Sequence, residues 1–287
     1  MQWLSGWKRK KLEPEWEFEA KGFLWRLVPS SNGYFVGEDR NVDAKTTSFF
    51  CLDQESGVVR WKDVQFDERW WIGIEEVHED ILFLHEYATP DLPEHKKIYA
   101  ISLITGTMMW MNDTVKFLFA HEERVYASKD SYDRRNFFEV DIHNGTVVRD
   151  LDAEYVQVLR EIAVAKKVEQ VEFPVPFGVQ NISNSQIKKG IDKATSHARD
   201  VREIEYLHKN QTLAVGYYDN VSTKPTEQHL EQHLVIVEEE KSRVLLSEVL
   251  TAHATMTVPD SFFGKGDYLY YIKDRKSLKA VRLNDKD

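Results

Sequence analysis

The residues best suited to chemistry stand in one short segment of this sequence, where histidines and carboxylates lie close together. The segment contributes five candidate side chains, which are His85, Glu86, Asp91, Glu94 and His95. Imidazole and carboxylate groups can together transfer protons or hold a divalent metal ion. They can equally form a solvated rim in which the side chains bond to one another. The residues leave both interpretations open.

Four further residues are candidates for ligand binding, namely Glu38, Asp39, Arg40 and Trp71. The charged triplet could contact a polar ligand. The indole of Trp71 could stack on a sugar or a peptide, or it could pack in the core. What these side chains can do depends on the elements that position them.

Those elements are short strands, because the chain repeats one hairpin plan. An apolar run, a tight turn and a second apolar run occupy residues 49–61, and the plan returns at residues 98–110 and 137–148. Gly57, Gly106 and Gly145 stand at the turn position where a positive φ is needed. The repeat therefore predicts equivalent hairpins in successive units.

Two more strand-like runs precede each hairpin, so each unit contains four expected strands. The expected strands are 23–28, 34–36, 48–52 and 58–61 in the first unit, 70–77, 81–87, 97–101 and 108–111 in the second, and 116–120, 124–128, 136–140 and 147–151 in the third. Four short strands per unit, repeated at intervals of 40 to 50 residues, are typical of a β-propeller.

The rest of the chain supplies two more units. A fourth contains strands 202–207, 212–218, 234–237 and 244–250; a fifth begins at 256–258 or 261–263, continues through 268–272 and 278–283, and then ends. A strand at residues 15–19 could complete the fifth unit and so remove two open sheet edges. We therefore predict an all-β fold, a propeller of five blades closed by an N-terminal strand. Residues 1–14 would be a leader and residues 15–287 a single domain.

Residues 152–200 do not show the four-strand pattern. Residues 154–171 have helical spacing of apolar residues, with Asp152 as a possible N-cap, and residues 187–198 could form a second helix. We interpret this segment as a partly helical insertion between the third and fourth blades. The alternative is a degenerate sixth blade.

The long connections join the second strand of each unit to its third. They are residues 38–47, 88–96, 129–135 and 219–233, and in a propeller they would share one face. Pro90 and Pro93 would stiffen the second of them. Because loops on a rigid scaffold often carry function, this face is the predicted binding face.

The hairpin motif resembles the PQQ-like, or quinoprotein-like, repeats of β-propellers. The match rests on Asp53, Ser56, Gly57 and Trp61 in the first unit, on Ala100, Thr105, Gly106 and Trp110 in the second, and on Asp141 and Gly145 in the third, where Arg149 stands near the tryptophan position. The resemblance implies a glycine for the turn and a tryptophan that packs between blades. Quinone-binding relatives have eight blades and adjacent cysteines, which this chain lacks, so we expect no quinone and no other cofactor.

The chain also looks like a family of uncharacterised bacterial propellers known as a domain of unknown function. That likeness rests on residues 37–40, 70–75 and 93–96. It implies a fold, but it does not imply an activity.

Composition narrows the range of partners. The net charge is −10, which disfavours binding to the phosphates of nucleic acids. The single cysteine, Cys51, cannot form an intrachain disulfide, which fits a reducing compartment, so we expect a cytoplasmic protein. No apolar run is long enough for an integral membrane segment.

The sequence contains no phosphate loop, no Cys-x-x-Cys motif and no nucleophile elbow. We therefore expect a non-enzymatic binding or scaffold propeller that recognises a protein or a small polar ligand on the long-loop face. The alternative is a hydrolase or lyase that uses His85, His95 and Glu94, with or without a metal.

Overall fold

The computed structural model describes residues 11–89, 92–166, 171–178, 185–222, 229–254, 256–258 and 261–283. Its strands form five antiparallel sheets of four or five strands each. This arrangement fits the expected propeller-like fold. The chain divides into two compact units, one of residues 20–169 and one of residues 1–19 and 170–287.

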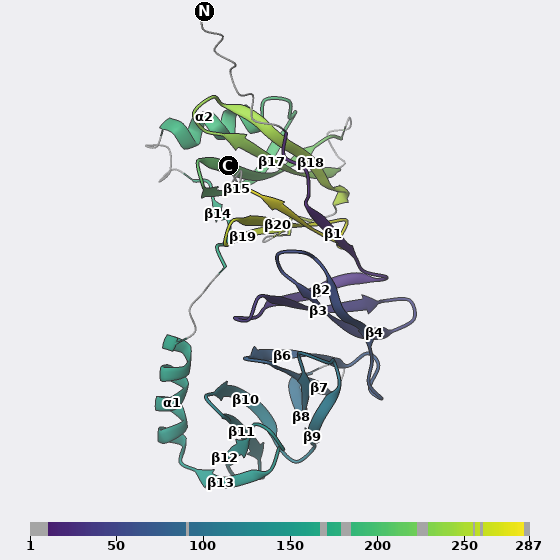
Figure 1. Ribbon diagram of the computed structural model, residues 1–287, viewed down its shortest axis with the longest axis vertical. Coiled ribbons are helices and arrows are strands. Elements are labelled where there is room, and N and C mark those ends of the chain that lie inside the picture. The colour runs from purple at the N-terminus through teal and green to yellow at the C-terminus, as the bar shows by residue number, and fades with distance from the viewer. Residues whose placement is uncertain are drawn as a thin grey trace, which may run out of the picture. The chain divides into compact units, whose positions relative to one another are not determined.

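The unit of residues 20–169 contains three sheets, each of four strands in chain order (Figure 1). The first comprises β2 (Phe23–Pro29), β3 (Tyr34–Asn41), β4 (Thr46–Asp53) and β5 (Val59–Val64); the second comprises β6 (Ile72–His78), β7 (Ile81–Thr89), β8 (Leu92–Ser102) and β9 (Met108–Asn112); the third comprises β10 (Lys116–His121), β11 (Arg124–Asp130), β12 (Arg135–Asp141) and β13 (Val147–Leu151). Each strand expected in the first three repeats is found.

The connections that we expected to be long are shorter than predicted. Glu38, Asp39 and Arg40 lie in β3, which pairs with β4 as far as Asn41. Glu94 and His95 lie in β8 rather than in a loop. Polar residues at these positions resemble a loop in the sequence, but the ladder of backbone hydrogen bonds continues through them because the partner strand continues as well.

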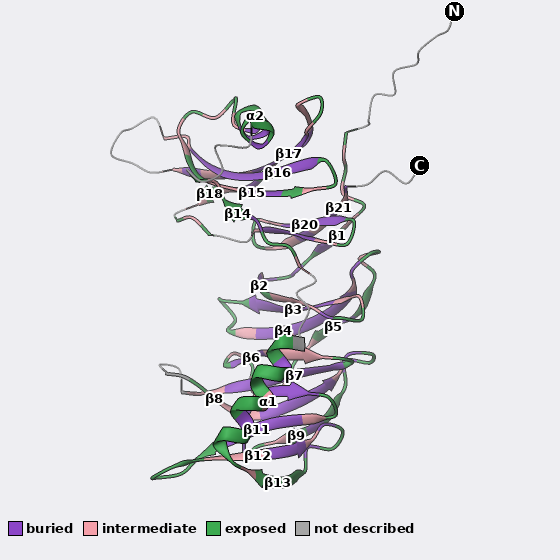
Figure 2. Cartoon of the chain, turned by 90° about the vertical axis from the view of Figure 1, so that its left-hand side faces the viewer, coloured by how far each residue is buried: buried purple, intermediate pink, exposed green. Residues whose placement is uncertain are grey.

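Apolar side chains fill the spaces between successive sheets of this unit. The first and second sheets share a cluster that includes Cys51, Ile74 and Leu84. The second and third sheets share another, which includes Phe83 and Phe117. Figure 2 shows that buried residues extend along the strands of these sheets. Because the second sheet is covered on both faces, strand β7 begins with a continuous apolar run, Ile81 to Leu84.

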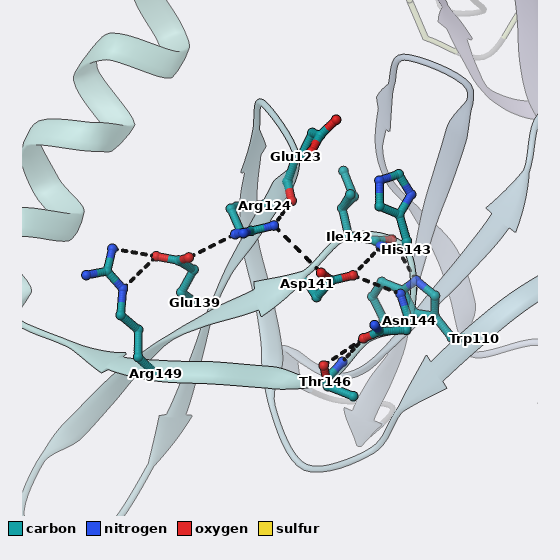
Figure 3. Close-up of polar contacts among 10 residues, drawn as sticks. All are labelled: Trp110, Glu123, Arg124, Glu139, Asp141, Ile142, His143, Asn144, Thr146 and Arg149. Atoms are coloured by element: carbon teal, nitrogen blue, oxygen red, sulfur yellow. Dashed lines mark hydrogen bonds and ion pairs between the residues drawn. The ribbon is translucent and has the colours of Figure 1, made fainter.

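The tryptophan and glycine of the repeat join one sheet to the next. The indole N–H of Trp61, in the first sheet, donates to the carbonyl of Leu103 at 2.8 Å, and the ring lies against Gly106. The indole N–H of Trp110, in the second sheet, donates to the carbonyl of Ile142 at 2.7 Å (Figure 3). The ring of Trp110 lies against Gly145. The expected role of these residues in packing between sheets is thus observed.

The third sheet has a different arrangement at the equivalent position. Arg149 binds Glu139 through Nε at 2.9 Å and Nη2 at 2.7 Å, and Glu139 also accepts from Arg124 (Figure 3). The guanidinium carbon of Arg149 lies 5.9 Å from the ring centroid of Tyr155, in helix α1 (Ala153–Lys166). This helix packs on the third sheet through Val156, among other residues.

The unit of residues 1–19 and 170–287 contains two sheets. One consists of β14 (Val175–Pro176), β15 (Val201–Lys209), β16 (Thr212–Asn220), β17 (Leu230–Glu238) and β18 (Arg243–Ala254), and the other has the order β1 (Trp16–Glu19), β21 (Ser277–Arg282), β20 (Tyr268–Lys273) and β19 (Phe262–Lys265). In β1, Phe18 is opposite Leu278 of β21. The N-terminal strand therefore completes the last sheet, as predicted.

Residues 152–200 are partly helical, as predicted. Helix α1 is followed by the short strand β14 and by α2 (Ser185–Ala194), and Glu172 forms a bridge with Gly264. Helix α2 covers the β16–β17 surface with Ile187 and Ile191.

Of the expected leader, residues 1–10 lie outside the described residues, whereas the backbone N–H of Leu12 donates to the carbonyl of Leu245 at 2.9 Å. In the part of the chain that the structure describes, no helix is both long and apolar enough to span a bilayer.

Candidate functional site

The pairing of β6, β7 and β8 brings together two of the predicted histidines. His85 is opposite Gly73 of β6, and His95 is opposite Tyr87 of β7. Residues that are opposite each other, and residues two apart on a strand, share one face of a sheet. His85, Tyr87 and His95 therefore lie on the same face of the second sheet.

A carboxylate from β6 completes this cluster. The β6–β7 register shifts between Ile74 and Glu76, so Glu75 is the extra residue of a bulge. Bulges commonly redirect a side chain. The Oε1 atom of Glu75 lies 2.5 Å from Nδ1 of His95 and 3.3 Å from Nδ1 of His85. We call Glu75, His85 and His95 the histidine cluster.

The two imidazole rings of the cluster are stacked. Their centroids are 3.5 Å apart and their planes differ by 8°. The ring of Tyr87 meets both of them edge-on, at 4.7 Å from His85 and 5.2 Å from His95. The aromatic neighbour thus contacts both rings, and the Nδ1 atom of each ring lies within 3.3 Å of the same carboxylate.

His85 is the buried member of the cluster. It is only 2% exposed, and among the described residues neither of its ring nitrogens has a hydrogen-bond partner. Burial lowers the pKa of His85 to about 3, and the nearby charges of His95, Arg26 and Arg40 act in the same direction. The imidazole is therefore neutral at physiological pH and retains a free lone pair.

The cluster reaches the surface through its other members. The side chain of His95 is 32% exposed, and that of Glu75 is 15% exposed. Trp71 is 37% exposed and meets Tyr87 edge-on at 6.2 Å. A molecule that approached His95 from solvent would therefore find aromatic surface nearby.

Gly73 leaves a narrow space beside His85. A Cβ atom at this position would lie 3.2 Å from Oε1 of Glu38, 3.2 Å from Cε1 of His85 and 3.4 Å from Nη2 of Arg40. A side chain at this position would press on all three polar groups, so glycine lets them approach the β6 backbone more closely than a larger residue would.

Glu38 and Arg40 use their charged groups to join the first sheet to the second. Nε of Arg40 donates to Glu38 at 2.9 Å, and its Nη2 donates to the carbonyl of Ile72 at 2.7 Å. Oε1 of Glu38 accepts from the backbone N–H of Ile74 at 2.7 Å. A buried ion pair needs such additional hydrogen bonds. These two predicted ligand residues thus have a clear structural role.

Asp39 also has internal partners. Its carboxylate accepts from the backbone N–H groups of Lys21 at 2.8 Å and Gly22 at 2.7 Å. The structure places it beside the start of the first sheet, and its predicted contact with a ligand remains a prediction.

Glu86 follows His85 in the sequence but belongs to another group of contacts. It accepts hydrogen bonds from Lys97 at 2.8 Å and from the hydroxyl of Tyr99. Burial by itself would raise the pKa of Glu86, but these hydrogen bonds hold it below its ordinary value. Neighbouring strand residues point to opposite faces, which explains why Glu86 does not join His85.

Of the remaining two candidates, one lies outside the described residues and the other does not join the cluster. Asp91 lies outside the described residues. The side chain of Glu94 is 48% exposed and forms an ion pair with Lys116, which also pairs with Asp130 at 2.8 Å. The predicted group of His85, His95 and Glu94 is therefore replaced in the structure by His85, His95 and Glu75.

Sequence reasoning missed Glu75, Tyr87 and Gly73. The signal for Tyr87 was its spacing of two from His85, which places both side chains on one face of a strand. The signal for Glu75 was weaker, because its role depends on the register between β6 and β7.

Comparison with known proteins gives little functional information. A family model described as a domain of unknown function (DUF4905) matches residues 28–110, which include the histidine cluster. No curated protein matches the chain. Among solved structures, the chain is similar to the hydrazine synthase of Kuenenia stuttgartiensis, with 13% identity and a TM-score of 0.26. That alignment covers 85% of this chain and 59% of the other.

Proposed function

We propose that the chain is a non-enzymatic binding protein that recognises a small polar ligand at the histidine cluster. The observation that carries this proposal is the buried ring of His85, whose nitrogens have no hydrogen-bond partner among the described residues. Leaving a buried polar atom without a partner costs about 1–3 kcal/mol. A ligand that supplied the missing contact would recover part of this cost.

We also propose that the five sheets are the blades of a closed propeller. Support comes from the repeated four-strand order and from β1, which supplies the last strand of the final sheet. Closure would remove the open faces and edges of the first and last blades. A rigid ring would also hold β6, β7 and β8 in a fixed register and so position the cluster.

An enzymatic role has less support. The hydrolase or lyase alternative requires Glu94 to act with the two histidines, and Glu94 is paired with Lys116 instead. Glu75 could take its place, but the short contact between Glu75 and His95 is also what an ordinary ion pair would form. A fold of this kind does not decide between binding and catalysis.

The test is a ligand screen with matched variants. Mixtures of amino acids, organic acids, sugars and nucleotides would be tested for binding by ligand-observed NMR, first with the native chain and then with His95→Ala and Trp71→Ala. We expect at least one compound whose affinity falls about tenfold or more in both variants, because each removes a partly exposed side chain beside the cluster. His143→Ala is the control, since this exposed histidine lies on the distant β12–β13 turn.

Two results would contradict the proposal. One is that no compound in the mixtures binds the native chain. The other is that every bound compound binds His95→Ala and His143→Ala equally well, which would place recognition elsewhere on the molecule.

A further inference from the structure

We propose that Glu75, His85 and His95 form a binding site for a divalent transition-metal ion, best suited to zinc, with one coordination position open to solvent. The inference rests on the proposed function for its location, and it deepens that proposal by naming the chemistry of the site. Among the described residues, these three form the one group of histidine, cysteine or acidic side chains whose ligand atoms all lie within 4.8 Å of one another.

One distance in the cluster already matches that of a zinc site. In a tetrahedral site with metal–ligand bonds of about 2.0–2.1 Å, neighbouring ligand atoms are roughly 3.3 Å apart. Oε1 of Glu75 and Nδ1 of His85 are already 3.3 Å apart. The corresponding separation from His95 is 2.5 Å, and its ring is stacked parallel to that of His85, so a metal ion would require the His95 ring to move away from Glu75 and to tilt out of the stack until its lone pair points at the ion.

The ring of His95 has room for that movement, whereas the ring of His85 does not. His95 lies near the surface with its side chain 32% exposed, and His85 is buried against Tyr87. The sheet therefore provides one rigid ligand and one adjustable ligand. A ligand whose position the sheet already fixes, such as His85, loses little conformational entropy when the metal binds.

The unpartnered nitrogens of His85 distinguish a metal site from an ordinary ion pair. A Glu75–His95 pair accounts for the contact between those two residues. It leaves His85 buried with neither nitrogen hydrogen-bonded among the described residues. A metal ion would use the free lone pair and the Glu75 carboxylate together.

Nearby cations are committed to other partners. Nη1 of Arg26 donates to the carbonyl of Ile74, and its Nη2 lies 3.5 Å from the carbonyl of Glu75. Arg40 binds Glu38. These hydrogen bonds hold both guanidinium groups on the β6 backbone or on a carboxylate, and among the described residues neither group pairs with the carboxylate of Glu75.

The ligand types indicate which metal would bind. Imidazole suits zinc, copper, nickel and iron, whereas magnesium and calcium prefer sites made only of oxygen. Two histidines and one carboxylate with an open fourth position are the ligand set of several zinc proteins. The open position would allow a water molecule or a polar ligand to bind the metal next to the aromatic surface of Trp71 and Tyr87.

The inference is tested by metal titration of the full-length chain without an affinity tag. Protein stripped with a chelator would be titrated with zinc against a chromogenic chelator, and with cobalt(II), whose visible spectrum reports tetrahedral coordination. We expect one zinc ion per chain and a tetrahedral cobalt spectrum. Glu75→Gln and His95→Ala should each weaken zinc binding by about tenfold or more, as the loss of a ligand requires.

Matched controls separate this site from others. His208→Ala removes a histidine that pairs with Glu239 at 3.0 Å, and Glu94→Gln removes the carboxylate bound to Lys116. Both should leave zinc affinity unchanged. Because His85→Ala could disrupt the core, Glu75→Gln and His95→Ala are the deciding variants, with folding verified by circular dichroism.

The outcomes distinguish this inference from the proposed function. The proposed metal site is contradicted if zinc does not bind. It is also contradicted if zinc binds the native chain, Glu75→Gln and His95→Ala with equal affinity. If an organic compound still binds the chelator-treated chain and requires His95, the proposed function survives that result. If zinc binds as expected and no organic compound does, the metal site stands and the proposed recognition of an organic ligand fails.

Discussion

At the scale of single residues, His85 depends on neighbours from two strands, β6 and its own strand β7. Gly73 leaves the space, Tyr87 fixes the ring, and Glu75 supplies the adjacent carboxylate. A substitution at one of these neighbours should therefore alter the geometry of the cluster, even though both histidines are retained.

Gly73→Val should disturb the cluster together with the adjacent Glu38–Arg40 ion pair. Its first side-chain atom would approach Glu38, His85 and Arg40 within 3.2–3.4 Å, and the two further methyl groups would displace them. We expect a loss of stability of about 1–3 kcal/mol from overpacking, and zinc affinity reduced about tenfold or more. Gly178→Val is the control, because nothing lies within 4 Å of a Cβ at that position. Equal zinc affinity in both variants would show that the Gly73 space does not support the site.

Cys51 should be unreactive in the folded chain. Its side chain is fully buried, and burial raises the pKa of the thiol to about 12, although Arg60 partly opposes this effect. The reactive species is the thiolate, which accumulates only as the pH approaches the pKa. We expect no labelling by a disulfide reagent at pH 8 and complete labelling in denaturant. Val42→Cys is the control, because its added thiol stands at a position that is 48% exposed and should react at once. Rapid labelling of two thiols in that variant would contradict the assignment of Cys51 to the core.

At the scale of elements, the hairpin turns at Gly106 and Gly145 connect successive sheets in the unit of residues 20–169, because each packs against a tryptophan of the preceding sheet. The glycine provides both a positive φ and a flat surface for the tryptophan of the preceding sheet. These two roles can be separated, because Gly33 has a positive φ but no tryptophan against it.

Gly145→Ala should therefore cost more stability than Gly33→Ala. Both residues have positive φ, 72° and 81°, so both substitutions introduce backbone strain of about 1 kcal/mol. Only at Gly145 would the new Cβ lie 2.4 Å from the ring of Trp110. We expect an additional loss of about 1–3 kcal/mol in urea denaturation. Similar losses of stability in both variants would mean that the ring of Trp110 can move to accommodate the new Cβ atom.

The short strand β1 should contribute strongly to the last sheet. Phe18 is buried and lies opposite Leu278, whereas its neighbour Glu19 is exposed. Phe18→Ala should destabilise the chain by about 3 kcal/mol, a typical cost for truncating a buried phenylalanine. Glu19→Ala should change stability by less than about 0.5 kcal/mol. Equal midpoints in urea for the two variants would indicate that β1 is dispensable.

At the scale of the whole molecule, the proposed closed ring predicts cooperative unfolding. If the blades form one ring, loss of β1 would remove the closing strand and lower the stability of every blade. Calorimetry should then show one transition for the native chain, shifted as a whole to lower temperature by Phe18→Ala. Two transitions, with only one shifted by the variant, would indicate two units that unfold independently and would contradict closure.

Much of the fold could be predicted from the sequence because its signals are local. A glycine at each of the first three hairpin turns, and apolar runs of strand length on either side, depend only on residues close together in the chain. The same is true of α1, whose apolar spacing predicted a helix over residues 154–171 and whose observed extent is Ala153–Lys166. The pairing of β1 with β21 could be inferred by counting strands. The first unit was preceded by one strand more than it needed, and the fifth unit had one strand too few.

Tertiary structure decided which residues form the candidate site. Adjacent residues such as His85 and Glu86 point to opposite faces of a strand, so their closeness in sequence did not place them together. Glu94 pairs with Lys116 of β10, whereas the bulge in β6 places Glu75 beside the histidines. The sequence by itself determined the strands, the turns and the two histidines; the register between strands decided which carboxylate lies beside them, because a shift of one residue turns a side chain to the other face.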